Sequence, residues 1–162
     1  MRKLLQTSIS IGLLATGCHS LDAPEHPPRL ALRYHEARYD LTFDLPASWQ
    51  GYSVTTQEWV GYPSKIDHGP VMVLRHPQWR AAKPYQDIPI MVFTRSQWEA
   101  EEQGKFFPYA GGVIAEMWHN RKYVFGIYSR YNADDDVQGC HEADDIIHQN
   151  QAAHPEPQLY PE

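Results

Sequence analysis

Residues 39–46, Tyr-Asp-Leu-Thr-Phe-Asp-Leu-Pro, decide the fold because apolar and polar side chains alternate along them without a break. Successive side chains of a β-strand point to opposite faces, so this alternation predicts a strand with one buried and one solvated face. Further β-rich segments follow at residues 52–62, 71–74, 88–94, 112–118 and 123–131. Turn-forming residues separate these segments, and the turn at residues 119–122 favours a hairpin. The pattern is typical of an antiparallel sheet.

Two predicted helices interrupt the strands. Ser96 and Glu99 have the spacing of a capping box, which predicts a short helix that ends before Gly104. A second helix is predicted over residues 134–149, with three aspartates at residues 134–136, where the helix dipole favours negative charge. Its apolar residues fall on one face: Val137, Cys140, Ala143 and Ile147. The expected fold class is α+β, a mainly antiparallel sheet of five to six strands with a short helix and a C-terminal helix packed on one face.

The first residues predict export. Residues 1–17 combine a basic start, an apolar stretch and small residues at the end, which is the pattern of a signal peptide. The stretch is too short and too polar to span a bilayer permanently, which takes about 20 apolar residues. It ends in Leu14-Ala15-Thr16-Gly17-Cys18, which resembles the lipobox of bacterial lipoproteins and implies cleavage before a lipid-modified Cys18. The alternative is an ordinary secretory signal, after which Cys18 could pair with Cys140 in an oxidising compartment.

A lipid on Cys18 would place the chain in the cell envelope, anchored to a membrane. His19 follows the cysteine where an aspartate would signal retention in the inner membrane, so the outer membrane is expected in a two-membrane cell. Without the lipid, the chain would be secreted. Residues 18–33 hold three prolines among polar residues and are predicted to be an extended tether. Residues 34–149 are expected to form a single α+β domain, and residues 150–162 a disordered tail.

The charge of the chain limits its partners. The formal net charge of the 162 residues is -6 at pH 7, and removing residues 1–17 takes away Arg2 and Lys3 but no acid, which leaves -8. Nucleic-acid-binding proteins usually carry the opposite charge, because they must neutralise phosphates. The expected partners are therefore a membrane, through the lipid anchor, and an envelope protein or a small ligand, but no nucleic acid.

The sequence lacks the motifs of the common catalytic sites. There is no Gly-x-Ser-x-Gly elbow, no Cys-x-x-Cys pair and no glycine-rich phosphate loop. Residues 141–145 begin like a zinc-protease helix, but an aspartate takes the place of the second histidine. His141, Asp144 and His148 share one helix face and could hold a transition metal, although the solvated face of an acidic helix has the same spacing. No catalytic residue, metal or cofactor is therefore expected.

The segment from Arg75 to Asp87 is the candidate contact surface. It is long for a connection between two strands, and it gathers cationic, aromatic and amide side chains in an acidic protein. The candidate binding residues are His76, Trp79, Arg80, Lys83, Tyr85 and Gln86. The interpretation that we favour on sequence alone is structural: Trp79 and Tyr85 fold back to close the end of the sheet and leave Arg80 and Lys83 in solvent.

Three segments, residues 41–52, 76–79 and 86–94, look like a group of uncharacterised bacterial envelope proteins, many with lipoprotein signals. The resemblance covers residues 39–147 and implies an envelope location without implying an activity. The strand that ends in Leu45-Pro46 and is followed by Ser48-Trp49 is also similar to the opening of the PsbP-like fold, which implies an antiparallel sheet in a non-catalytic accessory subunit.

The expected function is that of an exported lipoprotein whose domain is a non-catalytic binding or accessory module of the envelope. The alternative is an envelope hydrolase that acts on a cell-wall or carbohydrate substrate. In that hydrolase, His76 or His68 and a nearby carboxylate would serve as the acid–base groups in a concave pocket.

Overall fold

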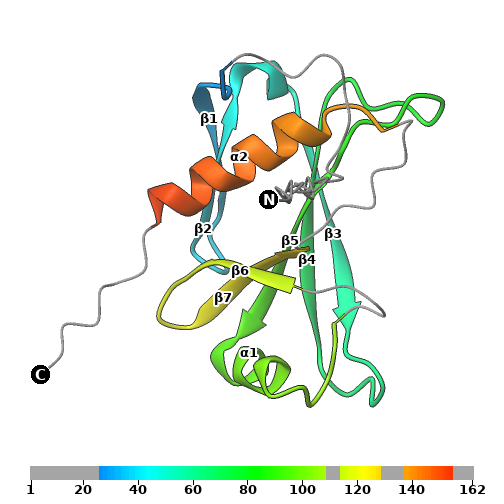
Figure 1. Ribbon diagram of the computed structural model, residues 1–162, viewed down its shortest axis with the longest axis vertical. Coiled ribbons are helices and arrows are strands. Elements are labelled where there is room, and N and C mark those ends of the chain that lie inside the picture. Colours follow the sequence, from blue (N-terminus) through cyan, green and yellow to red (C-terminus); the bar gives the residue numbers. More distant parts are fainter. Residues whose placement is uncertain (1–25, 109–113, 129–136, 155–162) are drawn as a thin grey trace, which may run out of the picture.

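The computed structural model describes residues 26–108, 114–128 and 137–154 (Figure 1). Its elements follow the chain in the order β1 (Leu30–Glu36), β2 (Leu41–Pro46), the 3-10 turn η1 (Ala47–Trp49), β3 (Ser53–Val60), β4 (His68–Arg75), β5 (Ile88–Thr94), α1 (Arg95–Glu102), β6 (Ile114–His119), β7 (Tyr123–Tyr128) and α2 (Cys140–Ala153). The α+β class predicted from the alternation of residues 39–46 is confirmed.

The predicted antiparallel sheet of five to six strands is confirmed with five strands, and a second antiparallel sheet of two strands accompanies it. Five strands pair in the order β3-β4-β5-β7-β6, and β1 pairs with β2 in a separate two-stranded sheet. The alternating stretch of residues 39–46 therefore lies in the small sheet. Sequence alternation identifies a half-buried strand but does not identify its partner, so this division could not be predicted.

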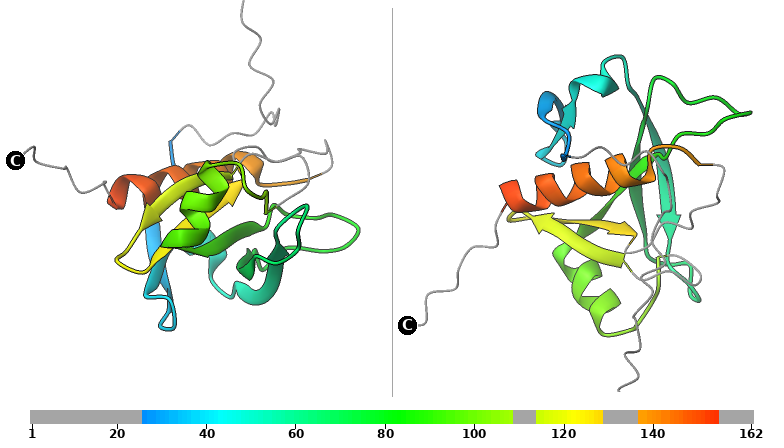
Figure 2. Two further views of the ribbon diagram at one scale, coloured as in Figure 1. Left: turned by 90° about the horizontal axis from the view of Figure 1, so that it is seen from below. Right: turned by 45° about the horizontal axis from the view of Figure 1, so that its top comes forward.

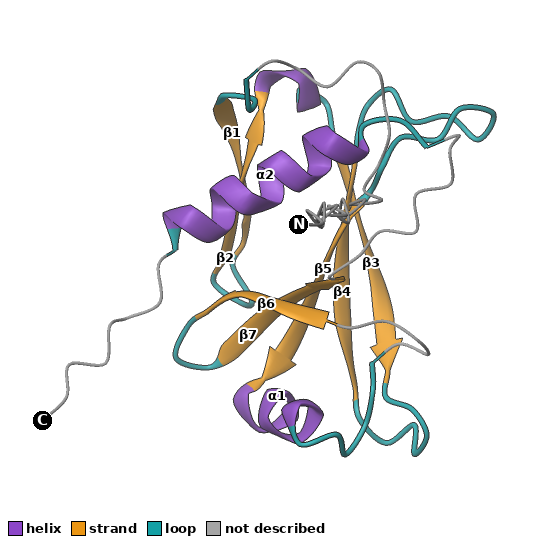
Figure 3. Ribbon diagram, in the orientation of Figure 1, coloured by secondary structure: helices purple, strands orange, loops and turns teal. Residues whose placement is uncertain are grey.

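The five-stranded sheet lies between two hydrophobic cores. On one face, side chains of β2 and α2 pack against the sheet around the fully buried Phe43 and Trp49. On the other face, the α1 residue Trp98 packs with Trp59 and Phe93. The C-terminal helix thus covers one face as predicted, and it shares that face with the β1–β2 sheet (Figure 3).

The described elements extend past both ends of the predicted domain. Strand β1 begins at Leu30, inside the predicted tether of residues 18–33, and its Leu32 and Tyr34 pack on the core. The prolines of that segment precede Leu30. Because a proline-rich stretch is typical of a tether, the alternation of apolar and polar residues that follows Leu30 was not recognised as a strand. Helix α2 continues to Ala153, past the predicted boundary at residue 149, because Asn150 is buried and hydrogen-bonded in the core.

Both helices begin at other residues than expected. The capping box that opens α1 is formed by Thr94 and Gln97, whose side chains bond reciprocally to each other's backbone N–H, and Ser96 is not the cap. Strand β5 ends at Thr94, so the helix follows it directly. Helix α2 begins at Cys140, because Gln138 is still paired with the segment at Pro84–Gln86. The three aspartates at residues 134–136 lie outside the described residues.

The predicted signal peptide, the lipid site at Cys18 and the first half of the tether, residues 18–25, also lie outside the described residues, as does the tail beyond His154. Within the described ranges, no helix is long and apolar enough to cross a membrane. Cys140, the alternative partner of Cys18, is buried at the first turn of α2. Its Sγ lies 3.7 Å from the Gln86 Oε1.

Candidate functional site

The segment from Arg75, the last residue of β4, to Asp87, the residue before β5, extends away from the body of the molecule at one end of the five-stranded sheet (Figures 1 and 2). Its tip is a tight turn in which the Lys83 N–H donates to the Arg80 carbonyl at 3.0 Å. The two strands that precede and follow the loop are paired and buried, so the loop starts from a rigid base. We refer to residues 75–87 as the β4–β5 loop.

Aromatic stacking holds the base of the β4–β5 loop. His76 is 3% exposed, and its ring stacks on the ring of Tyr85 with 3.9 Å between centroids. Both rings pack edge-on against Trp49, at centroid distances of 5.1 Å and 6.4 Å. Offset and edge-on aromatic contacts of this kind stabilise a fixed geometry beyond simple burial. The base of the loop therefore folds back onto the core, as expected for Tyr85.

A carboxylate on α2 completes the base. The Tyr85 hydroxyl donates a hydrogen bond to Glu142, and the other oxygen of that carboxylate accepts a hydrogen bond from the Ser48 hydroxyl at 2.7 Å. Burial, and then the hydrogen bond and charge of Glu142, raise the pKa of Tyr85, so the phenol stays protonated and donates at neutral pH. Ser48 and Glu142 were not among the residues predicted for the site.

The buried imidazole of His76 is held in its neutral form. Burial is the largest effect on its pKa and lowers it. The charge of Glu142 and the backbone of Ser48 raise the pKa and so offset part of that decrease. The His76 Nδ1 accepts a hydrogen bond from the Gln78 N–H at 3.1 Å, which leaves the proton on Nε2. Nε2 is buried, and no hydrogen bond satisfies it within the described residues. A substrate cannot reach this ring while it is stacked, so His76 is a packing residue in this structure.

An ion pair closes the two ends of the β4–β5 loop. The Arg75 guanidinium donates to both oxygens of Asp87, with the shortest contact at 2.6 Å. The same guanidinium lies over the Trp79 ring, 4.0 Å from its centroid, which is within the range of a cation–π contact. Arg75, the first residue of the loop, is therefore joined to Asp87, the last. It also holds Trp79 near the base.

Gln86 is positioned by the segment that precedes α2. Its N–H donates to the Gln138 carbonyl at 2.7 Å, and the Gln138 N–H donates to the Pro84 carbonyl at 3.0 Å. The Gln86 side chain is half-buried and donates to the backbone of Asp87 at 2.9 Å. These contacts satisfy its polar groups locally, so the role of Gln86 in this structure is to join the loop to the start of α2.

The tip of the β4–β5 loop is exposed and cationic. Arg80, Ala81, Ala82 and Lys83 are exposed. Arg80 uses one nitrogen, Nη1, to donate to the carbonyls of Pro77 and Trp79 at 3.0 Å and 2.6 Å. Neither Arg80 nor Lys83 forms an ion pair with any described residue. The six predicted residues thus divide into a structural base (His76, Tyr85 and Gln86), an exposed tip (Arg80 and Lys83), and the half-buried Trp79, which lies between them against Arg75.

The three metal candidates on α2 do not form a metal centre. His141 and Asp144 are half-buried and His148 is exposed, but no group of three metal-ligating side chains comes together among the described residues. Burial raises the pKa of Asp144, while the two histidines nearby lower it.

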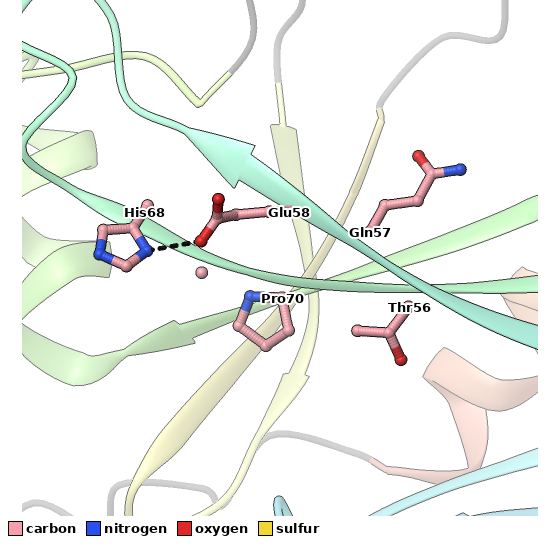
Figure 4. Close-up of a pocket in the computed structure, with 6 residues that line it drawn as sticks. Thr56, Gln57, Glu58, His68 and Pro70 are labelled. Atoms are coloured by element: carbon pink, nitrogen blue, oxygen red, sulfur yellow. Dashed lines mark hydrogen bonds and ion pairs between the residues drawn. The ribbon is translucent and has the colours of Figure 1, made fainter.

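A second polar feature lies on β3 and β4, away from the β4–β5 loop. An open depression is lined by Thr56, Gln57, Glu58, His68, Gly69 and Pro70 (Figure 4). Within it, the His68 Nδ1 lies 2.8 Å from a Glu58 oxygen, and both side chains are 61% exposed. The predicted histidine–carboxylate pair of the hydrolase alternative therefore exists at His68 in a shallow surface, while the buried His76 offers no such arrangement.

Comparison with known proteins adds no assignment. No family model matches the chain, and no match is found among curated proteins or solved structures.

Proposed function

We propose that the chain is an exported lipoprotein, anchored through Cys18, whose domain is a non-catalytic binding or accessory module of the cell envelope. The β4–β5 loop is its contact surface, and its partner is an envelope protein or a small ligand that carries negative charge. The lipobox-like end of the predicted signal supports the anchor. The architecture of the loop supports the binding role.

The observation that carries the proposal is a rigid base beneath an exposed cationic tip. The Arg75–Asp87 ion pair and the bond from Tyr85 to Glu142 fix the base. Little conformational freedom is therefore lost when the tip binds a partner, and preorganisation of this kind favours affinity. In a chain of net charge -6, two cations at a projecting turn that form no ion pair with a described residue favour a negatively charged surface.

The contact role is tested by photocrosslinking in intact cells. A photoreactive amino acid at the exposed Ala81 is expected to give a discrete adduct in the full-length protein. Replacing Arg80 and Lys83 with alanine in the same chain is expected to lower the yield about tenfold, because two interfacial charges are lost. The matched control replaces Arg121 and Lys122, an exposed pair of cations in the β6–β7 turn, and is expected to leave the adduct unchanged.

Three results would count against the contact role. One is an adduct whose yield is the same with and without Arg80 and Lys83. The second is a folded protein that gives no adduct from Ala81, and the third is the same adduct from a probe placed at Arg121.

The second candidate function is an envelope hydrolase that uses Glu58 and His68. The 2.8 Å contact between these side chains in an open depression favours it, because a general acid–base pair needs this proximity. The exposure of both side chains disfavours it, because hydrolases usually shield their reacting groups from bulk water. The binding role is therefore the better-supported proposal.

A further inference from the structure

Most sheet edges in the described part of the chain are covered or interrupted. The buried Asn150 of α2 accepts from the Asp44 N–H at 2.7 Å and donates to the Asp44 carbonyl at 2.8 Å, as a neighbouring strand would. The next residue, Gln151, donates to the Glu116 carbonyl at 3.3 Å. Helix α2 thus satisfies backbone groups of β2 and β6. The two-stranded sheet also has a register shift in β1, and β6 has one between Glu116 and Trp118.

The edge strand β3 has none of these protections within the described residues. Its eight residues pair with β4 in a continuous register and include no proline and no lysine. The four side chains in its middle, residues 55–58, are exposed on both faces of the sheet. Natural edge strands of this length usually carry a device that prevents pairing with another chain. Among the described residues this edge is regular and nothing covers it, so it is suited to such pairing.

The backbone groups that β3 directs outward can be identified. The Gly61 N–H donates to the Asp67 carbonyl on the β4 side, whereas Tyr62 exchanges both backbone hydrogen bonds with Phe107, at 2.8 Å and 2.9 Å. Strand alternation then directs the N–H and C=O of Val54, Thr56, Glu58 and Val60 outward as well. The edge therefore already pairs with another segment at one end, where Tyr62 meets Phe107. The outward backbone groups of β3 continue the row of hydrogen-bonding groups that begins at Tyr62.

We propose that β3 pairs antiparallel with β3 of a second copy of this chain. In a two-fold antiparallel pair one residue must face its own copy, so the central residue is Thr56 or Gln57. Glu58 is the single charged residue of the strand, and it faces Val54 in the first register and Thr56 in the second. Neither register places two like charges opposite each other. The uncharged polar side chains at the centre of the strand, Thr55, Thr56 and Gln57, favour hydrogen bonds between the two copies.

The depression beside β3 fits the same arrangement. Thr56, Gln57 and Glu58 line it from the edge strand (Figure 4), so a strand added to this edge would lie next to it and place side chains over it. The proposal concerns a surface separate from the tip of the β4–β5 loop and holds or fails independently of the contact role proposed for that loop.

Single cysteines test the pairing in the full-length chain in native membranes. Thr56→Cys and Gln57→Cys each place a thiol opposite its copy in one register, at a Cα separation suited to a disulfide. Under mild oxidation, one of these variants is expected to give about tenfold more dimer, of twice the monomer mass, than Ala31→Cys on the exposed side of β1. The chain without an introduced cysteine measures the background from Cys18 and Cys140.

A proline distinguishes pairing from random collision. If the pair is centred on Gln57, Thr56→Pro removes an outward N–H that the ladder with β4 does not use, so the dimer of the Gln57→Cys chain is expected to be lost while its melting temperature changes little. If the pair is centred on Thr56, Glu58→Pro is the equivalent change in the Thr56→Cys chain. The proposal is overturned if neither cysteine gives more dimer than Ala31→Cys, or if the adduct has a mass other than twice that of the monomer. The second result would assign the edge to a different protein.

Discussion

Replacing Trp49 with alanine is expected to lower the free energy of unfolding by about 3–5 kcal/mol, because this is the usual cost of deleting a buried aromatic side chain. The Trp49 side chain is fully buried, and the rings of His76 and Tyr85 both pack edge-on against it. The cavity would therefore open where η1, α2 and the base of the β4–β5 loop meet. Urea denaturation followed by circular dichroism measures the change.

Trp79→Ala is the matched control, because it makes the same chemical change within the loop. Trp79 is half-buried, and the Arg75 guanidinium lies over its ring, 4.0 Å from the centroid. Losing that contact is expected to cost about 0.5–1 kcal/mol. Equal destabilisation by the two variants would contradict the division of the loop into a packed base and an exposed tip.

Replacing Gly139 with alanine is expected to detach the β4–β5 loop from α2, at a cost of about 3 kcal/mol. Gly139 has a φ of 74°, where a side chain costs about 1–2 kcal/mol. The added Cβ would also overlap the ring of Tyr85. The ring must then move away from Glu142, and a hydrogen bond to a charged group contributes about 1.5–3 kcal/mol. Faster hydrogen exchange of the loop amides would report the detachment of the loop, and a lower urea midpoint would report the loss of stability.

Gly104→Ala separates the backbone cost from the ring contact. Gly104 has a similar φ of 68°, but an added Cβ would meet no atom within 4 Å. We expect this variant to lose about 1–2 kcal/mol with no change in loop exchange. If Gly139→Ala were no more harmful than Gly104→Ala, the contact between Gly139 and Tyr85 would not hold the loop.

Local patterns in the sequence predicted most of the elements. Strand β5 occupies the predicted residues 88–94, and the apolar residues of the predicted C-terminal helix, such as Ala143 and Ile147, are buried. These features depend on residues that are close in the chain, because side-chain periodicity is a local property. Strand β1 was missed because its short alternation follows a proline-rich segment that is typical of a tether.

Contacts between distant residues could not be predicted. The loop was selected from its composition, but the bond from Ser48 to Glu142 spans 94 positions and the bond from Tyr85 to Glu142 spans 57. No local signal distinguishes Glu142 from the other acidic residues of α2, because its role depends on where the β4–β5 loop meets the helix. The same reason explains why the placement of β2 in a second sheet was not predicted.

The central claim is that the chain is an envelope lipoprotein, and the intact mass of the mature protein purified from its native envelope tests it most directly. We predict a chain that begins at Cys18 and is heavier than residues 18–162 by the mass of attached acyl groups. A mature chain that carries no lipid, or that begins at another residue, would contradict the claim and would favour a secreted protein in which Cys18 remains a thiol.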